Sequence, residues 1–205
     1  GYLQTTPLQL CLMTAQLANG GYKIYPKITV NENDDTVEKI KELINKNSIK
    51  DKKTQEGLLS GQDLLGFIKE EKYQPLYRNS ENVKYILSTM FASTNEIRGT
   101  SYSSRIDDPK YQFAGKTGTS QVKRITARDR ELDLKTIEIP YEERDHALYI
   151  AFGPYKNPRY AISIVVEHGG SGSSTAAPIA KKLFKMIIDK HEIREKNRIQ
   201  KIHTI

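Results

Sequence analysis

The apolar positions near the start of the chain repeat at helical spacing. Leucine and methionine recur every three or four residues after Thr6-Pro7, and the pattern stops at Asn19-Gly20-Gly21. Threonine is favoured as the residue that caps a helix, proline at its first position and glycine just past its end. We therefore expect a helix from Pro7 to about Asn19, followed by a short extended segment at 22–30.

Polar residues dominate the next part of the chain, and little of it is suited to burial. A helical stripe of valine, isoleucine and leucine persists as far as Ile44, but residues 45–57 are almost entirely polar. We expect a polar insert at 31–57 and a short helix at 61–71. A second amphipathic helix is predicted from Ser80 to about Gly99.

The hydrophobic pattern changes from helical to extended after Gly99. Three runs have the composition of strands, at 112–122, 147–153 and 160–167, and the last two are joined by a Pro-Tyr-Lys-Asn-Pro loop that suits a hairpin. A charged excursion at 123–145 separates the first two runs, and a Gly-Ser run leads into a final amphipathic helix from about Ile179. Helices followed by three antiparallel strands and a last helix predict an α+β fold.

Charge and length narrow the function classes. The chain of 205 residues carries a net charge of +7. Residues 180–205 hold eight basic and three acidic residues, so most of the excess lies at this end. We interpret the basic tail, 190–205, as a solvated helix face, and a contact with nucleic acid or anionic lipid is the alternative.

The one cysteine, Cys11, lies among leucines and is interpreted as a buried thiol.

The segment AGKTGTSQV, 114–122, has two possible chemical meanings. A phosphate-binding loop needs glycine five positions before Gly-Lys-Thr and a helix after it. Position 110 is lysine, and the residues after Thr117 favour a strand, so the nucleotide-binding interpretation fails on both requirements.

The other meaning is a substrate-binding strand beside a nucleophilic serine. Lys116 supplies a fixed positive charge, the Thr117 hydroxyl can donate to a substrate carboxylate, and Gly118 keeps the strand face open for a substrate backbone. The N–H of Thr119 can point at a developing oxyanion. Because three letters alone are weak evidence, this interpretation depends on the rest of the chain.

Other segments support it. GYLQTTPLQLCLMTAQLANGG at 1–21, Gly99-Thr100, AGKTGTSQV at 114–122, and DHALYIAFGPYKNPRYAISIVVEHGGSGSSTAAPIAKKLF at 145–184 occur in this order. Together they resemble the class B penicillin-binding proteins, and most of all the elongation-specific members. The resemblance covers nearly all of the chain apart from 31–57 and 123–145.

This resemblance implies a fold, an activity and a set of roles. The chain is expected to be the C-terminal part of a penicillin-binding or serine β-lactamase-like transpeptidase fold, 1–205. The parent is expected to be a peptidoglycan D,D-transpeptidase that cross-links stem peptides through an acyl-serine intermediate. The resemblance implies catalysis by Lys116 and substrate binding by Thr117, Gly118 and Thr119, with Thr117 and Thr119 binding the substrate carboxylate, and no cofactor or metal.

Partners and location follow from the same resemblance. The expected partners are the D-Ala-D-Ala end of a stem peptide, β-lactam antibiotics and cell-wall elongation proteins, with no nucleic acid and a possible dimer through a surface exposed by truncation. The parent is expected to be anchored on the periplasmic side of the cytoplasmic membrane, whereas these 205 residues are expected to be soluble.

Two of the family's three motifs have no valid match in the chain. Ser-x-x-Lys and Ser-x-Asn are expected before residue 1, so the chain is interpreted as a fragment that is inactive alone. Ser120–Lys123, Ser80–Asn82 and Ser93–Asn95 spell these motifs. The first is rejected because it falls on a predicted strand, where the two side chains cannot share a face. The other two are rejected because they come in the wrong order.

Two rival functions stay open at this stage. A β-lactamase or a β-lactam sensor would share the Lys-Thr-Gly strand, although the Thr-Pro-Leu-Gln helix and the Gly-Gly-x-Gly connection argue against both. A non-catalytic module that binds through its basic tail is the alternative from another class. The four histidines stand at no metal-ligand spacing and are interpreted as structural or solvated.

Overall fold

The computed structural model describes residues 4–26, 74–123 and 138–202, with side chains as far as Asn197. The chain divides into two compact units, one of residues 1–21 and 77–205 and the other of residues 22–76. The predicted insert at 31–57, the helix at 61–71 and most of the charged excursion lie outside the described residues. In the smaller unit, Tyr22 forms an isolated antiparallel bridge with Pro75.

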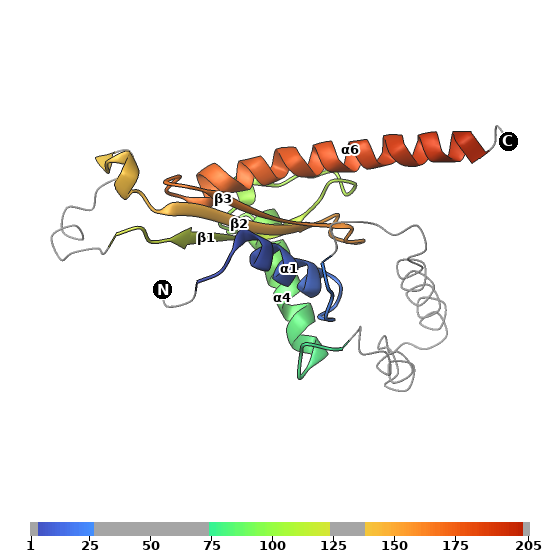
Figure 1. Cartoon of the computed structure of the whole chain (residues 1–205), viewed down its shortest axis with the longest axis horizontal. Helices are drawn as coiled ribbons and strands as arrows, with labels where there is room; N and C mark the ends of the chain where they lie inside the picture. Colours follow the sequence, from blue (N-terminus) through green and yellow to red (C-terminus); the bar gives the residue numbers. More distant parts are fainter. Residues whose placement is uncertain (1–3, 27–73, 124–137, 203–205) are drawn as a thin grey trace. The chain divides into compact units, whose positions relative to one another are not determined.

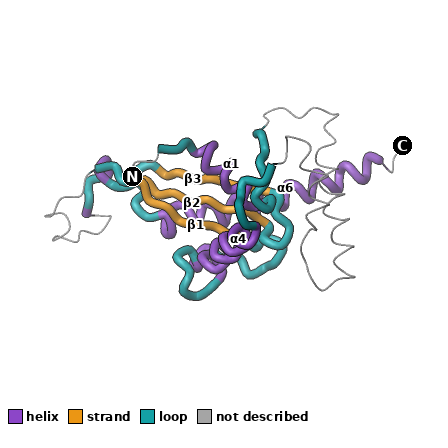
Figure 2. The backbone as a smooth tube through the Cα atoms, turned by 90° about the horizontal axis from the view of Figure 1, so that it is seen from below, coloured by secondary structure: helices purple, strands orange, loops and turns teal. Residues whose placement is uncertain are grey.

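The larger unit is built on a three-stranded antiparallel sheet in the order β1-β2-β3 (Figure 2). The strands are β1 (Ala114–Ser120), β2 (His146–Gly153) and β3 (Tyr160–Val166). All three predicted strands are confirmed, and the predicted hairpin joins β2 to β3. The first strand is shorter than expected and ends at Ser120, so Lys123 lies beyond it.

Helices cover both faces of this sheet (Figure 1). The long α6 (Ala177–Ile202) packs on one face, while α1 (Pro7–Ala18) and α4 (Ser80–Asn95) pack on the other. The chain has a hydrophobic core on each face of the sheet, and β2 contributes to both because its side chains alternate between the faces. Ala147, Tyr149 and Ala151 point toward α6, whereas Phe152 points toward α1 and α4. The predicted α+β architecture of three antiparallel strands with flanking helices is therefore confirmed.

The ends of α1 follow from its sequence. The Gln9 backbone N–H donates to the Thr6 hydroxyl at 3.2 Å, and the Thr6 N–H donates to the Gln9 side chain at 2.8 Å, which is a capping box. At the other end Gly20 and Gly21 have φ of 95° and 92°, a region that glycine enters without steric cost. The predicted start and stop of this helix are confirmed. The Cys11 thiol of α1 is only half-buried, and burial raises its pKa.

The Gly-Ser run forms a tight turn before the last helix. Residues Gly172–Ala176 make one turn of π-helix, and α6 begins directly after it at Ala177, two residues earlier than the pattern predicts. Helix α6 continues to Ile202, so the basic tail predicted at 190–205 is helical over most of its length. Among the described residues, no helix is both long enough and apolar enough to span a bilayer.

Candidate active site

The predicted site residues lie on β1, which is the outer strand at one side of the described sheet. In an antiparallel pair, residues opposite each other share a face. Thr117 pairs with Tyr149, which faces α6, and Lys116 pairs with Ile150, which faces α1 and α4. The Lys116 and Gly118 positions therefore lie on one face of the strand, and the two threonines, Thr117 and Thr119, lie on the other.

Lys116 and Thr117 are in direct contact. The Lys116 ammonium donates to the Thr117 carbonyl oxygen at 2.9 Å and lies 3.4 Å from the Thr117 hydroxyl. Lys116 is exposed and forms no ion pair with any carboxylate of the described residues. Its charge is therefore available to an anion that approaches the strand.

A row of hydroxyl groups continues from Thr117 to the end of α4. The Thr117 hydroxyl lies 3.4 Å from that of Thr100, which in turn lies 3.1 Å from the Ser93 hydroxyl. The row joins α4, the segment that follows it and β1, and it ends at the Lys116 ammonium. An ammonium beside hydroxyls that can each donate one proton is suited to holding a carboxylate. The sequence singled out Gly99-Thr100 as a shared segment but did not predict this contact.

A buried polar cluster of Thr94, Ser101 and Tyr149 fixes the start of β1. The Tyr149 hydroxyl lies 3.0 Å from the hydroxyls of both Thr94 and Ser101, and the Gly115 N–H donates to the Thr94 hydroxyl at 3.0 Å. All three side chains are fully buried. Burial is the main cause that raises the pKa of Tyr149, so the phenol is neutral and able to donate. Sequence reasoning missed this cluster.

Gly115 is required by this arrangement. A Cβ atom at position 115 would overlap the Tyr149 hydroxyl and ring, which pass directly over the glycine. The residue before Lys116 therefore has a packing reason to be glycine, since only its bare backbone leaves room for Tyr149.

The middle of β1 is supported by the turn that precedes α6. A Cβ atom at Gly172 would overlap the Leu148 carbonyl oxygen and lie 2.8 Å from the Gly118 carbonyl oxygen. The turn therefore packs directly on the backbone of β1 at the glycine of the Lys-Thr-Gly motif. By contrast, a Cβ atom at Gly118 itself would meet only Leu148 Cβ, at 3.3 Å.

Thr119 and the residues of two rejected motif matches, Ser120–Lys123 and Ser93–Asn95, lie in three different environments. Thr119 is exposed near the end of β1. Lys123 pairs with Glu143 at 2.5 Å, beyond the end of the strand that carries Ser120. The Asn95 side chain donates to the carbonyl oxygens of Phe91 and Phe113, at 3.1 and 2.9 Å, and so anchors the end of α4 to the segment before β1.

Two histidines join the ends of β2 and β3. The backbone N–H of His168 donates to Nδ1 of His146 at 2.9 Å, and their rings pack edge to face. His191 contacts Arg159 from α6, and His203 lies outside the described residues. Over residues 4–26, 74–123 and 138–202, no three histidine, cysteine or acidic side chains gather where they could hold a metal ion.

Comparison with known proteins identifies relatives of this chain. The peptidoglycan D,D-transpeptidase MrdA of Salmonella typhimurium LT2 is 39% identical over 104 residues, which are 51% of this chain and 16% of the relative. The MrdA protein of Haemophilus influenzae is 35% identical over 95 residues, which are 46% of this chain and 14% of the relative. The aligned residues thus make up about a sixth of these curated relatives.

Solved structures agree with the sequence relatives. Penicillin-binding protein 2 of Pseudomonas aeruginosa, in complex with WCK 5153, aligns with a TM-score of 0.51 and 27% identity, covering 88% of this chain and 29% of that chain. The D,D-transpeptidase domain of a peptidoglycan glycosyltransferase from Eggerthella lenta aligns with a TM-score of 0.55 and covers 93% of this chain and 33% of that chain. At 16% identity, this second match shows a shared fold alone.

A family model matches most of the chain. Residues 1–185 match the penicillin binding protein transpeptidase domain, which includes every strand and helix described in the larger unit except the end of α6. The resemblance seen in the sequence is confirmed. This chain therefore belongs to the penicillin-binding protein transpeptidase family.

Proposed function

We propose that this chain forms one wall of the active site of a peptidoglycan D,D-transpeptidase. The observation that carries the proposal is the contact between the Lys116 ammonium and the Thr117 hydroxyl on an outer strand of the sheet. Family membership and the names of the relatives support this reaction class. Lys116 is proposed as the catalytic residue, with Thr117, Gly118 and Thr119 binding the substrate.

The proposed substrate is the D-Ala-D-Ala end of a stem peptide. Its terminal carboxylate would be held by the Lys116 ammonium and by the hydroxyls of Thr117 and Thr119. Its backbone would lie along β1, where an outer strand offers unpaired N–H and C=O groups. Gly118 adds no side chain that would obstruct this path, and the Thr119 N–H would stabilise the oxyanion of the transition state.

The proposed reaction has two steps. A serine oxygen attacks the carbonyl carbon of the penultimate D-alanine, the peptide bond breaks, and the serine proton passes to the departing D-alanine amine. An amine of a neighbouring stem peptide then attacks the ester, forms a new peptide bond and returns a proton to the serine. The charge of Lys116 supports proton transfer and opposes the negative charge that develops.

The nucleophilic serine is proposed to lie outside these 205 residues. Ser120 is the one serine in the sequence with a lysine three positions later, and Lys123 is engaged by Glu143. A serine and lysine that act together need to share a helix face. The 205 residues alone are therefore expected to form no acyl-enzyme.

Covalent labelling with a fluorescent penicillin tests the proposal. The gene product that contains this chain should be labelled at a serine outside residues 1–205, as mapped by mass spectrometry of its peptides. Lys116→Ala should slow labelling by about a hundredfold to a thousandfold, the range seen when a transition-state donor is removed. Lys123→Ala, which removes the same charge three residues beyond β1, is the matched control and should label normally. Stoichiometric label on the isolated chain would contradict the proposal.

Partners and location belong to the same proposal. We propose that β-lactams bind in place of the D-Ala-D-Ala end, that cell-wall elongation proteins are partners, and that the enzyme works on the periplasmic side of the cytoplasmic membrane. Dimer formation stays a prediction. A β-lactamase would share the Lys-Thr-Gly strand, and rapid release of the penicilloyl group from the gene product would favour that function instead.

A further inference from the structure

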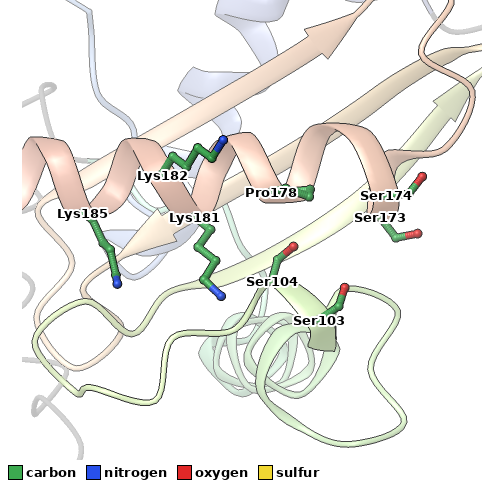
Figure 3. Close-up of a pocket in the computed structure, with 8 residues that line it drawn as sticks. All are labelled: Ser103, Ser104, Ser173, Ser174, Pro178, Lys181, Lys182 and Lys185. Atoms are coloured by element: carbon green, nitrogen blue, oxygen red, sulfur yellow. The ribbon is translucent and has the colours of Figure 1, made fainter.

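A cavity of about 450 Å³ lies on the α6 side of the larger unit, bounded by α6, the turn before it and the short 3-10 helix η2 (Tyr102–Ser104) (Figure 3). Three lysines of α6 line it, Lys181, Lys182 and Lys185, and serines line the remaining walls together with Pro178. Ligand-binding cavities commonly have volumes of about 300 to 1,000 Å³. No acidic side chain is among the lining residues.

The three lysines leave their charges available to a ligand. None of them forms an ion pair with a carboxylate of the described residues. Lys185 lies 5.9 Å from the centre of the Tyr111 ring and interacts electrostatically with Asp189, one helical turn further along α6. The Asp189 carboxylate already accepts from Lys110 at 3.3 Å and from the Tyr111 hydroxyl at 2.5 Å. The cavity therefore concentrates positive charge that the protein itself does not neutralise.

Ser104 places a hydroxyl group in the cavity. Its side chain lines the cavity, the residue is only 1% exposed, and no hydrogen bond from its hydroxyl to another protein group is found among the described residues. Its oxygen is not among the fully buried side-chain oxygens that lack a partner, so it opens on the cavity, where it can donate a hydrogen bond to a ligand. In Figure 3 the Ser104 hydroxyl points toward α6, while Lys181 and Lys185 extend from α6 toward the segment that carries Ser104.

We propose that this cavity binds a phosphoryl group, with the ammonium groups of Lys181 and Lys185 as charge partners and the Ser104 hydroxyl as hydrogen-bond donor. Lysine binds phosphate as a compact point charge, and a hydroxyl satisfies one of the phosphate oxygens. The volume leaves room for an organic group attached to the phosphate. None of the lining residues belongs to the row of hydroxyls formed by Thr117, Thr100 and Ser93, so this site is separate from it and does not depend on the transpeptidase proposal.

Titration calorimetry with inorganic phosphate tests the site in the gene product that contains this chain. Phosphate should bind saturably, and acetate should bind at least about tenfold more weakly because it carries one charge and two oxygens. Lys181→Ala and Lys185→Ala should each weaken phosphate binding by about tenfold, and Ser104→Ala by a smaller but measurable factor. Lys190→Ala removes the same charge from an exposed position of α6 outside the cavity and should leave the affinity unchanged.

Vesicles distinguish two sources of the phosphoryl group. If the source is a lipid headgroup, vesicles of phosphatidylglycerol should bind the protein, vesicles of phosphatidylcholine alone should not, and Lys181→Ala should reduce binding. If the source is a soluble compound, phosphate should bind while both kinds of vesicle do not, and either result supports the site. The proposal would be overturned if phosphate did not bind or if acetate bound equally well. It would also be overturned if Lys190→Ala and Lys181→Ala weakened phosphate binding equally, or if Ser104→Ala left the affinity unchanged.

Discussion

Replacing Gly115 with alanine should destabilise the protein far more than the same change three residues later, at Gly118. A Cβ atom at position 115 would lie 2.5 Å from Cζ and 2.7 Å from Cε1 of Tyr149, whereas carbon atoms in contact prefer about 3.5 to 4.0 Å. The tyrosine cannot withdraw, because it is fully buried and its hydroxyl is bound by Thr94 and Ser101.

The magnitude follows from two contributions. Overpacking of this kind typically costs about 1 to 3 kcal/mol. Displacement of the strand would also lose the hydrogen bond from the Gly115 N–H to Thr94, which contributes about 1 kcal/mol. Gly118→Ala brings a single contact, with Leu148 Cβ at 3.3 Å. Since both variants make the same change in the unfolded chain, we expect Gly115→Ala to be less stable than Gly118→Ala by about 2 to 4 kcal/mol.

Urea unfolding followed by circular dichroism measures this difference in the gene product that contains this chain. Labelling with fluorescent penicillin supplies a second comparison, because Gly118→Ala should keep its stability and lose labelling rate if the open face of Gly118 receives the substrate. Free energies of unfolding for the two variants that agree to within about 0.5 kcal/mol would refute the packing argument for Gly115. Normal labelling of Gly118→Ala would refute the role given to Gly118.

Three further predictions concern other parts of the fold. Thr6→Ala should cost about 0.5 to 2 kcal/mol in urea unfolding, because it removes the side chain that caps α1, and Thr6→Ser should restore most of this loss. Hydrogen bonding from Tyr111, followed by Lys110, lowers the pKa of Asp189, so its contribution to stability is present above the ordinary pKa of aspartate and is lost as the pH falls through the lowered value. Tyr111→Phe should raise the Asp189 pKa in an NMR titration, and an unchanged value would contradict this assignment. Gly172→Ala should speed amide exchange at Gly118, because its Cβ would overlap the backbone of β1 and β2; unchanged exchange there would show that the turn does not support the strand.

The elements that the sequence predicts well are those set by neighbouring residues. The capping box of α1 depends on Thr6 and Gln9, three positions apart, and the β2-β3 hairpin depends on a loop of six residues, 154–159. Their chemistry is local, so a pattern of residue types is enough to find them. The end of β1 is less well predicted because Gln121 and Val122 suit a strand although the pairing with β2 stops at Ser120.

The parts of the site that the sequence did not predict depend on distant contacts. Tyr149 meets Ser101 and Thr94 across 48 and 55 residues of chain, and nothing in the neighbourhood of any of the three marks it as a partner of the others. Serine and threonine are common on surfaces, so their burial has to be seen in the structure. The same holds for Ser104, whose burial against α6 gives it a significance that its sequence context does not.

The support of β1 at Gly115 and Gly118 has a consequence for binding. The Gly115 N–H donates to the Thr94 hydroxyl, and the turn that begins at Gly172 packs on the backbone of Gly118. The strand between them is thus ordered when the protein folds, and a peptide that docks on it does not need to order it again. If β1 binds a peptide as proposed, the entropic cost of arranging its backbone N–H groups would be met before the ligand arrives, so more of the contact energy would be left for affinity. The position of this short strand is thus set by a side chain of α4 and by the turn that precedes α6.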